Sequence, residues 1–151
     1  MTATDRAVHL ARTAAQAAAD RMASDIVLLD VSERLVITDA FVLATGSNER
    51  AVDAIVDAVE EALLGQGAKP VRREGIRSGR WVLLDFLDVV VHVQHAEERT
   101  FYALERLWRD CPVIPWVDAD AERAKARAAV AAAASSGSPL PARLGAAASE
   151  G

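Results

Sequence analysis

The stretch WVLLDFLDVVVHV, residues 81–93, decides the fold of this chain. As one strand, it would span roughly 43 Å at about 3.3 Å per residue. A domain of this size has a diameter of only about 35 Å. The stretch therefore has to fold back, and the natural break is DFLD, residues 85–88. This break predicts two strands, 81 to 85 or 86 and 88–93, with both aspartates at their junction rather than in the core.

The residues before this stretch predict further strands and a long helix. Three strand-like runs are residues 25–31, 40–46 and 69–75. In ERAVDAIVDAVEEALLGQG, residues 49–67, the apolar residues recur at helical spacing, which predicts an amphipathic helix. Asn48 can cap its start, and Gly65 or Gly67 can end it.

Two other helices are predicted on either side of these elements. An alanine-rich helix covers residues 5–23. In EERTFYALERLWRDCP, residues 97–112, the inner stripe is predicted to be Phe101, Leu104, Leu107 and Trp108. The order of elements predicts an α/β (α+β) fold, in which helices flank a small mixed β-sheet.

Composition bounds the kind of protein. With 52% hydrophobic and 26% charged residues, the chain suits one globular domain, residues 1–117. It has no run of about 18 uncharged apolar residues, so no membrane partner is expected. The single cysteine, Cys111, suits a reducing compartment, so we expect a cytoplasmic protein. The net charge of -5 disfavours a general grip on phosphates, so no specific nucleic acid is expected.

Residues 118–151 differ in composition from the rest of the chain. They hold four basic and four acidic residues, whereas residues 1–117 hold 13 basic and 18 acidic ones and thus all of the net charge. DADAERAKARAAVAAAA predicts a short alanine-rich helix capped by Asp118. The remainder lacks apolar periodicity. We expect an alanine-rich tail that is partly helical and then disordered.

Paired carboxylates can bind a metal or exchange protons, and Asp85 and Asp88 are three residues apart. On a continuous strand they would face opposite sides, and no third acid or histidine obviously joins them, so surface positions in a turn are the better prediction. His92 and His95 also point apart on a strand and have no cysteine nearby, which disfavours zinc. We expect no catalytic group, no metal and no cofactor.

ATGSNER, residues 44–50, joins a predicted strand to a predicted helix, where free backbone N–H groups can hold an anion. It matches neither of the glycine-rich phosphate motifs, and an N-cap at Ser47 or Asn48 explains it without a ligand. A nucleotide-handling enzyme usually carries alternating carboxylates on one strand face after such a turn, a spacing that Asp85 and Asp88 lack. That enzyme is the rival hypothesis, and a structural dimer module is a third.

Two aromatic residues are candidate contact points. Tyr102 is expected on the polar face of its helix among Arg99, Arg106 and Arg109, a combination that is typical of protein contacts. Trp81 opens a predicted strand, where it is either a core residue or a partly exposed anchor.

Two blocks of the chain carry a family pattern. The first is DIVLLDVSERLVITDAFVLATGSNERAV, residues 25–52. The second is WVLLDFLDVVVHVQHAEERTFYALERLW, residues 81–108. The second block resembles the ribosomal silencing factor family, also called the Iojap family, which has a tryptophan, an apolar run, two spaced aspartates and a histidine, then E-x-R-x-x-Y-x-L-E-x-L-W. The resemblance covers roughly residues 5–109.

The resemblance implies a domain similar in outline to nucleotidyltransferases, acting as a translational repressor and not as an enzyme. Family members bind the L-fourteen protein of the large ribosomal subunit, block subunit joining and lower translation when nutrients are scarce, as in stationary phase; they can also form homodimers. The implied partner-binding residues are Trp81, Asp85, Phe86, Asp88, Tyr102, Leu104, Glu105 and Trp108. The net charge fits docking on a basic protein, with Trp81 and Phe86, if exposed, as anchors beside an acidic rim.

The chain departs from the family pattern in two places. Leu87 stands where members commonly have glycine, which bears on how tightly the turn between the two strands can close. Ala51 stands where they commonly have histidine, so any role of that histidine does not transfer.

Overall fold

The computed structural model describes residues 2–76, 78–102 and 104–135, and their side chains except those of residues 101–105. The chain divides into two compact units, Met1–Trp116 and Val117–Gly151. In the second unit, α5 (Ala119–Ser135) begins after Asp118, whose carboxylate accepts the backbone N–H of Asp120 at 3.0 Å, so the predicted cap is confirmed. The predicted disorder falls on residues 136–151, which lie outside the described residues.

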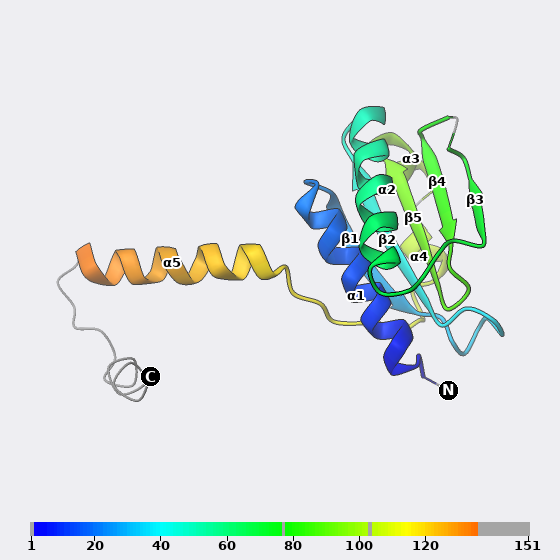
Figure 1. Cartoon of the computed structure of the whole chain (residues 1–151), viewed down its shortest axis with the longest axis horizontal. Helices are drawn as coiled ribbons and strands as arrows, with labels where there is room; N and C mark the ends of the chain where they lie inside the picture. The colour runs from blue at the N-terminus through cyan, green and yellow to red at the C-terminus, as the bar shows by residue number, and fades with distance from the viewer. Residues whose placement is uncertain (1, 77, 103, 136–151) are drawn as a thin grey trace. The chain divides into compact units, whose positions relative to one another are not determined.

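The first unit holds a mixed sheet with helices packed on it (Figure 1). Its elements are α1 (Asp5–Asp20), β1 (Ser24–Asp30), β2 (Ala40–Gly46), α2 (Glu49–Leu64), β3 (Arg72–Glu74), β4 (Trp81–Asp85), β5 (Val89–His95), α3 (Ala96–Tyr102) and α4 (Leu104–Leu107). The strand order is β1-β2-β5-β4-β3, in which β2 and β5 are parallel and all other neighbours antiparallel. The predicted fold class is confirmed.

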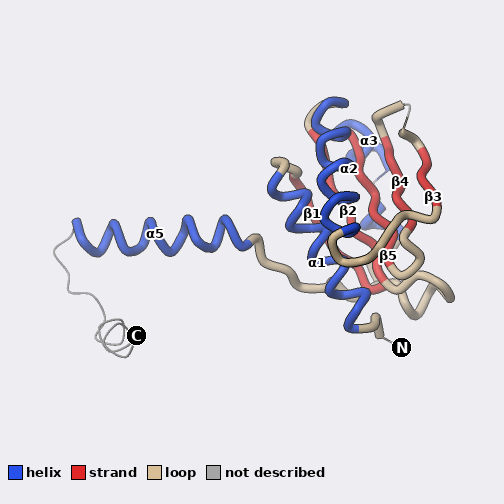
Figure 2. Tube along the Cα trace, viewed as in Figure 1, coloured by secondary structure: helices blue, strands red, loops and turns tan. Residues whose placement is uncertain are grey.

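The sheet has a hydrophobic cluster on each face. Helices α1 and α2 lie side by side on one face (Figure 2), and the larger cluster joins them to the sheet. The smaller cluster, on the other face, consists of Leu29, Val31, Phe41, Leu43, Val90 and Cys111. The central strands β2 and β5 are therefore covered on both sides, which explains why their sequences are continuous apolar runs rather than alternating ones. Strand β4 alternates between buried and half-buried residues because its second face is only partly covered.

The three helices predicted in the first unit lie where the sequence placed them, but the C-terminal one ends earlier than expected. Asn48 caps α2 by accepting the backbone N–H of Ala51 at 2.8 Å. The predicted inner stripe of the C-terminal helix is wrong at Leu107, which is 65% exposed. The reason is that α4 ends at Leu107, so Trp108 reaches the sheet from a turn and not from a continuing helix.

The turn between β4 and β5 closes tightly without glycine. Phe86 donates its backbone N–H to the carbonyl of Val89 at 2.9 Å, and Leu87 adopts a φ of 73°. The Asp85 carboxylate accepts the backbone N–H of Leu87 at 2.8 Å. A branched side chain in left-handed backbone is strained by about 1–2 kcal/mol, so the hydrogen bonds around the turn hold Leu87 where family members have glycine.

Replacing Leu87 by glycine should therefore stabilise the fold. The relief of left-handed strain exceeds the added flexibility of the unfolded chain, so we expect Leu87→Gly to raise the free energy of unfolding by about 0.5–1 kcal/mol. Urea unfolding followed by circular dichroism measures this change. Leu87→Ala is the control, because it shortens the side chain but keeps the Cβ that causes the strain. An equal gain in both variants would contradict the explanation.

Candidate partner-binding surface

The side of the sheet turned away from α1 and α2 carries Trp81 and Asp85. Cross-strand partners point to the same side of a sheet, so the pairing of β2, β5 and β4 defines that side. We call it the second face; its members on these strands are Phe41, Leu43, Thr45, Trp81, Leu83, Asp85, Val90, His92 and Gln94. The alternate residues of the same strands pack in the cluster under the two helices.

Four rings form a continuous aromatic row across the second face. The indole N–H of Trp81 donates to Nδ1 of His92 at 3.2 Å. His92 meets Phe41 edge to face with ring centroids 5.0 Å apart, and Phe41 meets Trp108 in the same way at 4.9 Å. The guanidinium of Arg34 lies 4.7 Å from the centroid of the Trp108 ring. We call these four rings the aromatic row: Trp81, His92, Phe41 and Trp108. The row joins three strands to the segment after α4.

Trp81 is half-buried, which agrees with a partly exposed residue and not with a core residue. Its backbone is fixed by the preceding hairpin, because Gly75, at a φ of 80°, lies directly against the backbone oxygen of Trp81. A Cβ at Gly75 would overlap that oxygen. The indole of Trp81 thus stays partly accessible while its N–H donates to His92.

Phe86 is not exposed, so it cannot be the docking anchor that the resemblance implied. It is only 7% exposed and packs in the larger cluster, on the helix-covered face. The physical reason is strand parity, since Phe86 continues the inward series of Val82 and Leu84 past the end of β4. Phe86 is a core residue and contributes to any docking only by holding the turn in place.

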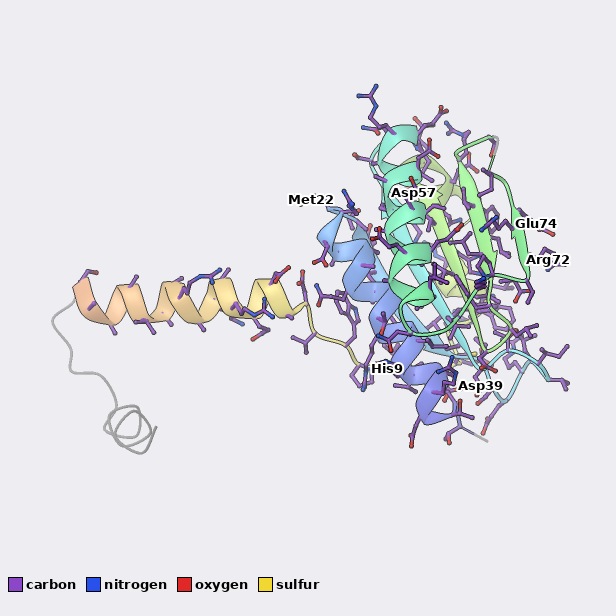
Figure 3. All side chains as sticks on the ribbon, in the orientation of Figure 1. His9, Met22, Asp39, Asp57, Arg72 and Glu74 are labelled. Carbon is purple, nitrogen blue, oxygen red and sulfur yellow. The ribbon has the colours of Figure 1, made fainter. Side chains whose placement is uncertain are left out.

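We call the turn between β4 and β5, with Asp85 and Asp88, the acidic turn. Its aspartates are more involved in holding the fold than the sequence suggested. Asp85, with a side chain 19% exposed, accepts the Leu87 N–H and lies 3.7 Å from the guanidinium of Arg72 on β3, which is labelled at the sheet edge in Figure 3. Asp88 is half-buried, and its backbone carbonyl accepts the N–H of Asp39 at 2.9 Å. No ion pair of the Asp88 carboxylate occurs within the described part of the chain. Asp88 is therefore the better candidate for contacting a basic partner.

Trp81 and the acidic turn lie at opposite ends of β4. The strand separates them by roughly 13 Å at about 3.3 Å per residue. The expected arrangement, an acidic rim directly beside Trp81, is therefore corrected. The aromatic row bridges the gap instead, because Phe41 shares its level of the sheet with Val90 and Asp85.

The two histidines of the H-x-x-H spacing have separate surroundings, as predicted. His92 is 6% exposed, and burial lowers its pKa to about 4. His95 ends β5, where its Nδ1 accepts the backbone N–H of Glu97 at 3.1 Å. Within the residues that have described side chains, no cluster of three or more histidine, cysteine or acidic residues is arranged to hold a metal.

The predicted C-terminal part of the site is only partly visible. The side chains of Tyr102, Leu104 and Glu105 lie outside the described residues, whereas Trp108 is half-buried in the aromatic row. Sequence reasoning missed Phe41 and the contact of His92 with Trp81. Strand alternation places Phe41, Leu43 and Thr45 on one side, but no sequence pattern says which strand lies beside which.

The turn after β2 offers a shallow depression of about 520 Å³ lined by Asn48, Glu49, Arg50 and His95. Its mixed charges and the Asn48 cap leave the turn explained as a helix start, as predicted. Across the described residues, no helix is long and apolar enough to cross a membrane.

The fold and the second face together define a class: a small mixed-sheet α/β domain that carries a partly exposed aromatic row next to an acidic turn. The family model described as "Ribosomal silencing factor during starvation" matches residues 4–139. The chain belongs to this family, whose members are regulatory proteins rather than enzymes.

Known relatives agree with this assignment. "Ribosomal silencing factor RsfS" from Halalkalibacterium halodurans is 39% identical over 106 residues, which is 70% of this chain and 91% of that protein. The protein of the same name from Bacillus subtilis is 38% identical over 102 residues, 68% of this chain and 86% of that protein. A crystal structure of a protein from Chromobacterium violaceum matches with a TM-score of 0.64 and 37% identity, covering 66% of this chain and 83% of that one.

Proposed function

We propose that the protein is a cytoplasmic translational repressor that binds the large ribosomal subunit through its L-fourteen protein, sterically blocks joining of the small subunit and so lowers translation under starvation. Family membership over residues 4–139 carries the proposal. No catalytic step is needed, because a domain bound at the joining surface acts by occupying space. Formation of a homodimer is part of the same proposal.

The second face supplies suitable chemistry for a basic protein partner. Trp81 offers a half-exposed indole, and large aromatic residues contribute most of the binding energy in protein interfaces. The acidic turn adds Asp88, and the chain as a whole has a net charge of -5. Charge of this sign speeds encounter with a basic surface and fixes the orientation of docking. We infer that the ribosomal protein contacts the two half-buried tryptophans of the aromatic row, Trp81 and Trp108, together with Asp88.

Co-sedimentation with isolated large subunits tests this proposal. Trp81→Ala should weaken binding roughly thirtyfold, which corresponds to about 2 kcal/mol for the loss of an aromatic anchor. Asp88→Arg should weaken it roughly fivefold at low salt and less at high salt, because the contact is electrostatic. Asp85 is a poor probe, since its carboxylate closes the turn and a substitution would change the fold.

The matched control is Asp57→Arg. Asp57 is exposed on α2, on the helix-covered side of the sheet (Figure 3), so the variant makes the same change of charge away from the second face. It should bind like the native protein. Equal losses in Asp57→Arg and Asp88→Arg would mean that only the total charge matters. Absence of binding by the native protein, together with Mg²⁺-dependent nucleotide turnover, would favour the enzyme hypothesis instead.

A further inference from the structure

His92 contacts the ring on each side of it in the aromatic row. It accepts the indole N–H of Trp81 on one side and meets the edge of Phe41 on the other, through which it reaches Trp108. Both tryptophans are only half-buried, whereas His92 is 6% exposed. A partner on the second face can thus touch the tryptophans, while His92 lies beneath them.

The hydrogen bond fixes the tautomer of His92. An indole N–H is only a donor, so Nδ1 of His92 is the acceptor and the proton of the neutral ring is on Nε2. Nε2 is buried and has no hydrogen-bond partner among the residues that the structure describes. Burial lowers the pKa of His92 to about 4, so the ring is neutral and keeps this tautomer near pH 7. The ring thus has a satisfied acceptor at Nδ1 and an unsatisfied donor at Nε2.

An unmade bond of this kind argues against a purely structural role. Leaving a buried donor unpaired costs stability, and a phenylalanine ring would fill a similar volume without that cost. The cross-strand neighbours of His92 are the apolar Leu43 and Leu83, while Gln94, two residues further along β5 on the same side, is buried with no hydrogen-bond partner for its side-chain amide among the described residues. The contribution that only histidine makes here is the acceptor at Nδ1 for Trp81.

We propose that His92 is a positioning residue for partner binding, which holds the indole of Trp81 in its docking orientation and couples it through Phe41 to Trp108. This inference rests on the proposed function, since the tryptophans are its contact residues. A side chain held in the bound orientation loses less conformational freedom on binding, so His92 strengthens the complex without touching the partner.

The first arm of the test needs no ribosome. In protein with ¹⁵N-labelled tryptophan, the indole N–H of Trp81 is assigned by its absence in Trp81→Phe. Its exchange with solvent should be at least tenfold slower than that of a freely exposed indole, and His92→Phe should remove this protection. His92→Leu is the second variant if the phenylalanine ring does not fit. His9→Phe, at an exposed histidine on α1, is the control and should leave the Trp81 resonance unchanged.

The second arm measures affinity for isolated large subunits in a double-mutant cycle. His92→Phe should weaken binding about fivefold while its stability at pH 7 is equal to or above the native value. In the Trp81→Phe background the same change should have almost no effect, because its target has been removed. A merely structural residue would lower stability and would act equally in both backgrounds.

The outcomes separate the two proposals. If the native protein does not bind large subunits, the proposed function fails, and a loss of indole protection in His92→Phe would still show that His92 holds Trp81. Unchanged protection in His92→Phe overturns the inference, whatever the binding result. Lost protection with unchanged affinity, or additive losses in the cycle, also overturns it, because His92 would then not act on docking through Trp81.

Discussion

Phe86→Ala is expected to lower the free energy of unfolding by about 3–5 kcal/mol, a typical cost of emptying a buried aromatic site. Phe86 is 7% exposed, and it packs in the cluster that joins α1 and α2 to the sheet. Removing the ring leaves a cavity in this cluster at the end of β4. Urea unfolding of the variant and the native protein measures the difference.

The same variant separates a core residue from a docking anchor. Leu87→Ala is the control, because Leu87 is the 47% exposed neighbour in the same turn and its truncation should cost less than 1 kcal/mol. For the fraction of Phe86→Ala that is folded, affinity for large subunits should stay within a few fold of native. A loss of stability below about 1 kcal/mol combined with a large loss of affinity would restore Phe86 as an anchor.

Acidification from pH 7 to pH 4 is expected to remove about 3 kcal/mol of stability through His92 alone. Unfolding exposes the ring and returns its pKa from about 4 to the ordinary value of 6.5. Between these two values the unfolded chain binds a proton that the folded protein excludes, so unfolding becomes easier by about 1.36 kcal/mol per pH unit. The contribution of His92 is complete above pH 6.5 and is lost as the pH falls toward 4.

Comparison with His92→Phe isolates this effect, because the variant has no group to protonate at that position. The difference in stability between variant and native protein should widen steadily from pH 6.5 to pH 4. His9→Asn, at an exposed histidine, should behave like the native protein. The Asp30 carboxylate also makes stability depend on pH, but at lower pH than His92 does. Partial burial alone would raise its pKa, but hydrogen bonds from Ser32 and Ala3 lower it below 3.8, so its contribution disappears only under stronger acid. A constant difference across the range would contradict the buried, neutral histidine.

Most of the elements followed from local rules. The length of residues 81–93 required a break, and the break lies at residues 86–88 between β4 and β5. The helical spacing of apolar residues and the Asn48 cap correctly predicted where α2 begins. The errors came where local pattern and packing differ: Leu107 fits an apolar stripe, yet α4 ends there and its side chain is 65% exposed.

The site was harder to predict because it depends on which strands are neighbours. The fold-back at residues 85–88 makes β4 and β5 neighbours, and periodicity says that Trp81 and Leu83 share a side of their strand. Neither gives the register of the two strands or the position of β2 beyond β5. His92 therefore gave no sign of its contact with Trp81, 11 residues away. Phe86 fits the residue type of a second aromatic anchor, but its strand places it in the core under the helices.

Chain length, residue periodicity and residue identity are enough to predict the strand break, the amphipathic helices, the mixed α/β class and the family pattern. Three features follow from packing and not from any local pattern: Asp85 closes the turn, Phe86 belongs to the core and His92 lies beneath Trp81. These contacts depend on the register of the β4–β5 hairpin and on the helices that cover one face of the sheet. The surroundings of His92 depend also on the parallel pairing of β2 with β5, which joins residues about 50 positions apart and leaves no local trace in the chain.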